Sequence, residues 1–151
     1  ARLWAVVFLA NMVGTLISGG ALASGLFFTA EAQAAFLEIG HHANAPDAAT
    51  IFLRGIVAGF IVAAIVWTLP SAAGAAGFLV VAVLTYLIAL GDLAHVVAGA
   101  VETFLLAFDG SLSWREAVLG FVLPALAGNI IGGTILFALI SYAQVRREIR
   151  E

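Results

Sequence analysis

The stretch FLVVAVLTYLIALGDLAHVVAGAVETFLLAF, residues 78–108, decides the fold of this chain. About 20 helical residues already cross the roughly 30 Å hydrocarbon core of a bilayer, so this apolar stretch is too long for one straight span. Its only acidic or basic side chains are Asp92, His95 and Glu102, and Gly91 stands just before the first of them. We therefore predict a helix that is broken near residues 91–95.

The composition predicts an all-α membrane protein. Of its residues, 64% are hydrophobic and only 10% are charged, and the mean hydropathy is +1.15. Soluble domains carry about 25% charged residues, so this chain has too few polar side chains to cover a soluble globule. The net charge of −3 and the lack of a basic cluster argue against nucleic acid as a partner. We expect a transport protein in a lipid bilayer, neither an enzyme nor a cofactor carrier.

Four apolar blocks are each long enough to span a bilayer, and they form one membrane domain over residues 1–151: 3–28, 51–69, 78–108 and 117–142. A polar external loop, residues 29–50, separates the first two blocks and is expected to hold one short amphipathic helix around residues 34–39. A charged tail, residues 143–151, closes the chain. Four spans place both termini on the same side of the membrane.

The arginines predict which side that is. Four lie on the terminal side and two on the other: Arg2, Arg146, Arg147 and Arg150 against Arg54 and Arg115. Cytoplasmic segments carry the excess of positive charge, so we expect both termini in the cytoplasm. The expected location is a bacterial-type inner or plasma membrane.

A short repeat links the first and last blocks. Asn11-Met12-Val13-Gly14 is matched by Asn129-Ile130-Ile131-Gly132, and the two blocks run in opposite directions. Inverted repeats with broken helices are a recurrent transporter plan, although chance or helix packing explains the repeat equally well. We expect Asn11 and Asn129 to satisfy backbone groups at helix breaks. Glycines in and near these motifs are expected to allow close helix packing: Gly14, Gly55, Gly59, Gly128 and Gly132.

His95 is the principal candidate for a pore residue, with Gly91 and Asp92 beside it. A small anion that enters an apolar constriction loses its hydration at great cost. Histidine, with a reference pKa of about 6.5, can attract the anion as imidazolium and then hand over its proton. Helix ends at the break add unpaired amide groups that favour negative charge. Asp92 is expected to cap the half-helix that follows the break.

Two other interpretations of these residues stay open. His95 can instead form a neutral hydrogen bond between helices, and Glu102 can be a solvated rim residue. Alternatively, Asp92, His95 and Glu102 are the ligands of an intramembrane metal-binding protein or metal transporter, since their spacings of three and seven suit one helical face. No His-Glu-x-x-His pair or second ligand cluster accompanies them, so we expect no metal site. An inactive membrane fragment is the remaining alternative.

The chain resembles the formate/nitrite transporter family. LPALAGNIIGG (residues 123–133) and YAQVR (residues 142–146) are similar to that family's last helix. Residues 4–14, 54–67 and 89–102 resemble its third, fourth and interrupted fifth helices. The family has six spanning helices and the resemblance leaves the first two without a counterpart, so the chain is expected to correspond to the C-terminal part of a divergent member.

This resemblance implies an aquaporin-like inverted-repeat bundle of six helices, assembled as a homopentamer. Each protomer would hold a pore for a small monovalent anion such as formate or nitrite. His95 matches the histidine on the family's interrupted helix. The chain departs from the family where Ala94 precedes this histidine and where Gly59 replaces a frequent asparagine, so the resemblance leaves the permeant anion open.

Overall fold

A computed structural model describes the backbone of residues 2–148 and the side chains of residues 2–143, and every regular element in that part is helical. The chain divides into two compact units. The first comprises Ala1–Ala48 and Val96–Pro124, and the second comprises Ala49–His95 and Ala125–Glu151. Each unit is described by itself below. The all-α fold predicted from the composition is confirmed.

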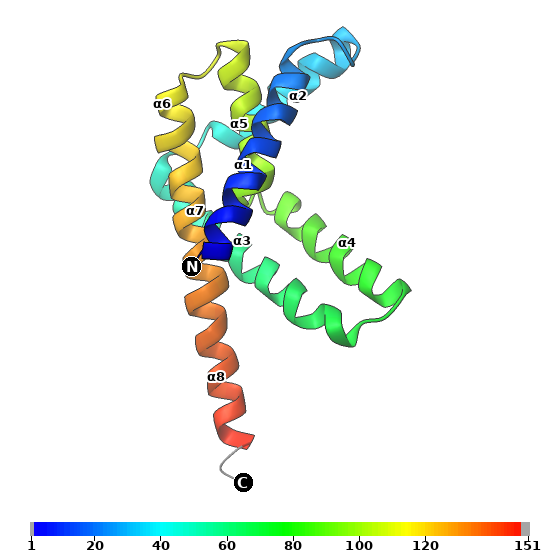
Figure 1. Cartoon of the computed structure of the whole chain (residues 1–151), viewed down its shortest axis with the longest axis vertical. Helices are drawn as coiled ribbons and strands as arrows, with labels where there is room; N and C mark the ends of the chain where they lie inside the picture. The colour runs from blue at the N-terminus through cyan, green and yellow to red at the C-terminus, as the bar shows by residue number, and fades with distance from the viewer. Residues whose placement is uncertain (1, 149–151) are drawn as a thin grey trace. The chain divides into compact units, whose positions relative to one another are not determined.

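The first unit is built around α5 (Val96–Asp109), which carries most of its buried side chains. Two helices pack against α5 in Figure 1, α1 (Arg2–Ala23) and α2 (Ala30–Asn44). A Cβ atom on Gly19 of α1 would lie 2.9 Å from the backbone nitrogen of Leu105, so the backbones of α1 and α5 nearly touch there. Burial of α5 between these helices explains why it is the core of this unit.

The ends of α1 and α2 differ from the predicted boundaries. α1 ends at Ala23, five residues before the end of the apolar run, and Gly25 follows with a positive φ of 65°. The loop helix is much longer than residues 34–39, because Thr29 caps α2 with its hydroxyl oxygen, which accepts a hydrogen bond from the Ala32 amide at 3.3 Å. Hydropathy reports the membrane environment, whereas these boundaries depend on caps.

The second unit begins with α3 (Ala48–Thr68), which continues into a short 3₁₀ turn, η1 (Leu69–Ser71). After that turn, α4 (Ala75–Leu90) runs back in the direction opposite to α3, as Figure 1 shows. The end of the chain adds α7 (Leu123–Ile130), a π-helical segment η3 (Ile131–Leu136) and α8 (Phe137–Glu148). The ring of Phe137 packs 5.6 Å from Phe60 and 5.9 Å from Trp67 of α3, measured between ring centroids.

The last apolar block is not a uniform α-helix. It starts with α6 (Trp114–Glu116), where Ser113 and Glu116 form a capping box, and passes into a π-helical segment, η2 (Ala117–Val122). η3 forms a second π-helical segment beyond α7. Neither segment was predicted from the pattern of apolar residues. Such segments are rare and occur frequently at functional sites.

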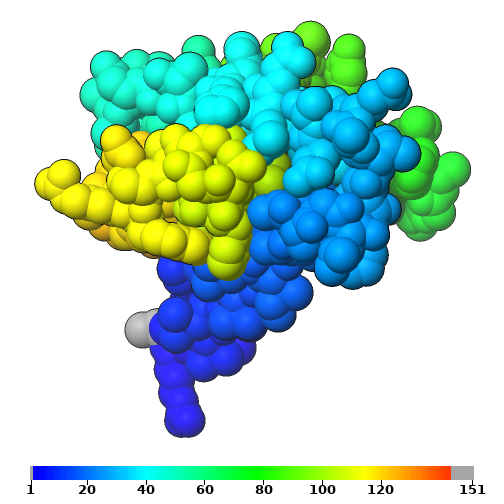
Figure 2. Space-filling view, turned by 90° about the horizontal axis from the view of Figure 1, so that it is seen from above, coloured from blue at the N-terminus to red at the C-terminus, as the bar shows by residue number. Residues whose placement is uncertain are grey.

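Three of the helical stretches are long and apolar enough to cross a membrane: Arg2–Ala23, Ala48–Ser71 and Trp114–Ala143. The remaining predicted block is divided into α4, with 16 residues, and α5, with 14 residues. Exposed large apolar side chains are numerous, and the first turns of α1, dark blue in Figure 2, carry Leu3 and Trp4 at 71% and 63% exposure. A surface of this kind suits lipid or partner helices.

Candidate functional site

The interruption between α4 and α5 begins with a well-formed helix end. The Leu93 amide donates a hydrogen bond to the Ile88 carbonyl at 3.0 Å, and the Asp92 amide donates to the Ala89 carbonyl at 3.1 Å. This pair of bonds is the Schellman motif, which satisfies carbonyls that would otherwise lack partners at the end of a helix. The helix therefore stops at a defined point, and the break is not a frayed end.

The residue that turns the chain at this point is Asp92. Its φ is 48°, in the left-handed region, while Gly91 keeps a φ of −88° as the C-cap. Glycine is the usual residue in that conformation, but aspartate and asparagine tolerate it better than most others. The helix therefore does end at Gly91, as we expected, but the residue that turns the chain is Asp92. The predicted capping of α5 by the Asp92 carboxylate stays a prediction.

Two side chains hold the backbone of the interruption from outside. Asn129 of α7 donates from Nδ2 to the Ala94 carbonyl at 2.8 Å and to the Gly55 carbonyl at 2.9 Å. Arg54 of α3 donates from Nη1 to the Asp92 carbonyl at 3.2 Å. Non-helical backbone within a bilayer needs such partners, because no water is available to satisfy its polar groups. Both ends of the short segment are thus tied to neighbouring helices.

Close contact between α3 and α7 brings Asn129 to the interruption. A Cβ atom on Gly59 would overlap the Asn129 backbone, and one on Gly128 would overlap the carbonyl of Phe52. A Cβ atom on Gly132 would likewise meet the carbonyl of Ile56. The two backbones lie against each other over several turns, and this contact is possible only where side chains are absent. Gly55 belongs to the same contact, since a Cβ atom added to it would lie 3.1 Å from the Ala125 carbonyl oxygen.

His95 is the last residue of the interruption and directly precedes α5. Its side chain is half-buried. It follows Ala94, whose carbonyl is bound by Asn129, so the backbone that carries the imidazole is held on one side by a hydrogen bond. Four of the predicted site residues therefore meet in the second unit. Three belong to the interruption, Gly91, Asp92 and His95, and the fourth, Asn129, binds its backbone.

Sequence reasoning missed the contribution of Arg54 to this site. We used it only as a charge that indicates orientation, but its guanidinium reaches backbone 38 residues further along the chain. One signal was present: an arginine well inside an apolar helix is costly in a membrane and usually has a partner there. That partner could not be identified from the sequence because it is a backbone carbonyl.

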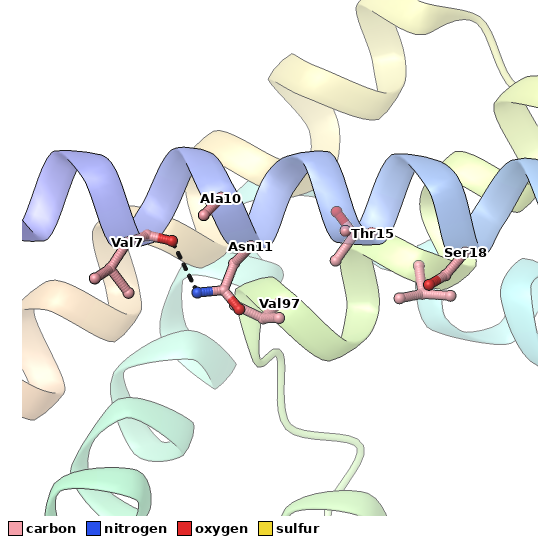
Figure 3. A pocket seen from close by; sticks show the side chains of 8 residues that line it. Val7, Ala10, Asn11, Thr15, Ser18 and Val97 are labelled. Carbon is pink, nitrogen blue, oxygen red and sulfur yellow. Dashed lines mark hydrogen bonds between the residues drawn. The ribbon is translucent and has the colours of Figure 1, made fainter.

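The matching motif of the first unit lies on an open face of α1. Asn11 donates from Nδ2 to the Val7 carbonyl of its own helix at 2.9 Å, and Gly14 has no atom within 4 Å of an added Cβ. Figure 3 shows Asn11 pointing from α1 toward Val97 of α5. The face borders a cavity of about 490 Å³, lined by Val7, Ala10, Asn11, Gly14, Thr15, Ser18, Val97 and Val101. Within the described residues, Asn11 and Gly14 thus lack the close contacts with other segments that Asn129 and Gly132 make.

The metal-binding alternative is not supported by the arrangement of the acidic and histidine side chains. Within residues 2–143, no three His, Cys, Asp or Glu side chains lie close enough together to hold a metal ion. Asp92 and His95 belong to the interruption, whereas Glu102 lies half-buried in the middle of α5. The helical spacing on which that alternative depended fails because the helix is broken before Val96.

The fold and this site define a class: an all-helical membrane protein with a broken helix whose exposed backbone is held by polar side chains. The chain belongs to the formate/nitrite transporter family, because the family model of that description matches residues 1–143. It is 44% identical over 148 residues to the inner membrane protein YfdC of Escherichia coli strain K12. That match covers 98% of this chain and 47% of the relative.

The predicted family membership is confirmed by these comparisons. The chain spans about half the length of the curated relative it matches. The matches do not support the narrower prediction that it is only the C-terminal part of a member. No solved structure matches the chain.

Proposed function

We propose that this protein is a membrane channel or transporter for small monovalent anions, such as formate or nitrite. The interruption ending at His95 is the observation that carries the proposal, because a non-helical segment with a histidine divides an otherwise apolar stretch of chain. Membership of the formate/nitrite transporter family supports the same substrate class. The relative in Escherichia coli is an inner membrane protein by its name, which supports an inner-membrane location.

His95 is the proposed proton donor in the pathway. In the membrane interior a small anion is costly, and transfer of one proton to it removes the charge. His95 directly precedes α5 in the chain, and the N-terminus of such a helix carries about half a positive charge. The anion would be attracted by this helix end and by the imidazolium, and would cross the apolar constriction as a neutral acid. The imidazole would then regain its proton from the solution on one side.

Anion flux into proteoliposomes tests this proposal directly. We expect His95→Ala and His95→Phe to abolish or strongly change the pH dependence of formate and nitrite flux. His41→Ala is the matched control, because His41 is exposed on α2. Flux of the His95 variants that equals wild-type flux at every pH would contradict the role of His95. Absence of flux in the wild-type protein would favour the alternative of an inactive fragment.

The orientation and the assembly are further parts of the proposal. We place both termini in the cytoplasm, on the basis of four arginines against two on the opposite side. A homopentamer is proposed from the family alone. Accessibility of single cysteines in inside-out and right-side-out vesicles tests the orientation, since the chain has no cysteine of its own. The mass of the detergent-solubilised protein tests the pentamer.

The open face of α1 is the proposed seat for a second interrupted helix that is not among residues 1–151. The same Asn-x-x-Gly motif in α7 holds α3 and the Ala94 carbonyl, so the motif in α1 is suited to equivalent partners. A cysteine replacing Gly14 in the membrane-embedded protein should then be protected from thiol reagents. Leu26→Cys, beyond the end of α1 and with its side chain 81% exposed, is the control that should react. Equal reaction at both positions would leave no role for the motif.

A further inference from the structure

We propose that Arg54 is a positioning residue for the anion pathway, and that it acts by donating a hydrogen bond to the Asp92 carbonyl. This inference rests on the proposed function, because Arg54 affects the anion pathway only if His95, at the end of the same segment, takes part in it. Arg54 is distinct from Asn129, which holds the segment at the Ala94 carbonyl. The two donors together set where the chain lies between the end of α4 and the start of α5.

The depth of Arg54 in α3 makes a partner necessary. It lies six residues into a helix that begins at Ala48, about 9 Å along the axis at 1.5 Å per residue. An arginine inside a spanning helix is costly there unless its guanidinium reaches the interface or finds acceptors. Among the described residues, the Asp92 carbonyl is an acceptor that this guanidinium binds, at 3.2 Å.

The interruption in turn needs the donor. The Asp92 carbonyl belongs to the residue in the left-handed conformation and lies beyond the last turn of α4, so it cannot bond within that helix. A carbonyl without a donor in hydrocarbon costs free energy comparable to that of a lost hydrogen bond. The guanidinium and the freed carbonyl therefore satisfy each other, and each explains why the other is tolerated.

The two hydrogen bonds converge on one short piece of α3. Arg54 binds the Asp92 carbonyl directly, and the neighbouring Gly55 carbonyl shares the Asn129 amide with Ala94. The start of the interruption is thus bound by Arg54, and its end is linked through Asn129 to Gly55, the next residue of the same helix. Loss of the Arg54 bond would remove one of the hydrogen bonds that hold the segment, and His95 would sample more positions than it does in this structure.

The labelling rate of a cysteine at position 95 measures this positioning without reference to transport. The chain has no native cysteine, so His95→Cys gives one reporter, and N-ethylmaleimide is an uncharged reagent whose approach is insensitive to the charge of Arg54. In membranes, we expect Arg54→Met to raise the labelling rate about tenfold, through more frequent local opening. Arg54→Lys should restore a rate close to that of the parent, because its ammonium is also a donor. Arg115→Met, on the exposed α6, is the control and should leave the rate unchanged.

Two results would overturn the proposal. One is an Arg54→Met rate equal to that of the parent, and the other is an Arg54→Lys rate as high as that of Arg54→Met. If Arg54→Met protein does not accumulate, Arg54→Leu is used in its place and the same outcomes apply. Anion flux with His95 present is measured in parallel, and we expect it to fall in Arg54→Met and to recover in Arg54→Lys. Failure of wild-type flux would refute the proposed function, while the labelling result would still decide whether Arg54 positions residue 95.

Discussion

The side-chain nitrogen of Asn129 lies 2.8 Å from the carbonyl oxygen of Ala94, across 35 residues of sequence. It also binds the Gly55 carbonyl, so one amide joins α7, α3 and the interruption. A single side chain therefore holds three backbone segments of the second unit together.

Replacement of Asn129 by leucine should lower the stability of the protein more than any exposed substitution. It would leave the carbonyls of Ala94 and Gly55 without their donor, at a cost of about 1–3 kcal/mol for each buried group. The measurement is the thermal unfolding midpoint in detergent. Thr85→Val is the control, because that exposed hydroxyl binds carbonyls of its own helix. Equal losses for the two variants would contradict the role that we assign to Asn129.

Gly132→Ala should separate α3 from η3. The added methyl group would meet the Ile56 carbonyl and would lie 2.9 Å from the Phe60 nitrogen, and both are backbone atoms that cannot move aside alone. We expect a loss of about 1–3 kcal/mol, as for other overpacked contacts. Gly120→Ala, in the same long helical stretch, has open space around it and should be neutral or slightly stabilising. Unfolding midpoints of the two variants provide the comparison.

At Asp92 the side chain should matter less than the backbone conformation. Asn and Gly tolerate a φ of 48°, whereas a β-branched residue is strained there. We expect Asp92→Asn and Asp92→Gly to retain more stability than Asp92→Val, which should lose roughly 1–2 kcal/mol or more relative to them. Hydrogen exchange at residues 91–95 locates the effect. A valine variant as protected as the asparagine variant would show that this backbone conformation is not required.

Thr103→Val should loosen α2 from α5. The Thr103 side chain is completely buried, and its hydroxyl lies 3.0 Å from Asn44 Oδ1 and 2.8 Å from the Gly99 carbonyl. Valine keeps the shape but leaves the Asn44 oxygen without this donor, at a cost of about 1–3 kcal/mol. Proteolysis within α2 should become faster. Thr85→Val is the control, since that hydroxyl bonds only its own exposed helix, and its proteolysis rate should match that of the parent.

The class of fold and the place of the interruption could be predicted, because both depend on composition along one stretch of chain. The apolar stretch of residues 78–108 is too long for one straight span, and Asp92 and His95 lie near its middle. These two facts predicted a break in residues 91–95, where the structure has it. The residue that makes the turn could not be predicted in the same way. Glycine is the better candidate by intrinsic preference, yet Gly91 is the cap and Asp92 turns the chain.

The supporting contacts were harder to predict because their partners are backbone atoms. Asn129 carried a signal, since a buried amide needs partners and its motif is repeated. Arg54 carried the signal of an arginine in an apolar helix, but no side-chain pattern reveals a carbonyl 38 residues away. The two π-helical segments had no signal in hydropathy, because their extra residue per turn leaves the apolar composition unchanged.

The glycine contact between α3 and α7 has a consequence for leakage. At Gly59, Gly128 and Gly132 a methyl group would collide with the opposite backbone, so a water molecule, which needs at least as much room, is excluded as well. Backbone atoms have no rotamers that could swing away and open a gap. At these glycines the seam therefore leaves no room for water between the two backbones, even while side chains elsewhere in the protein move.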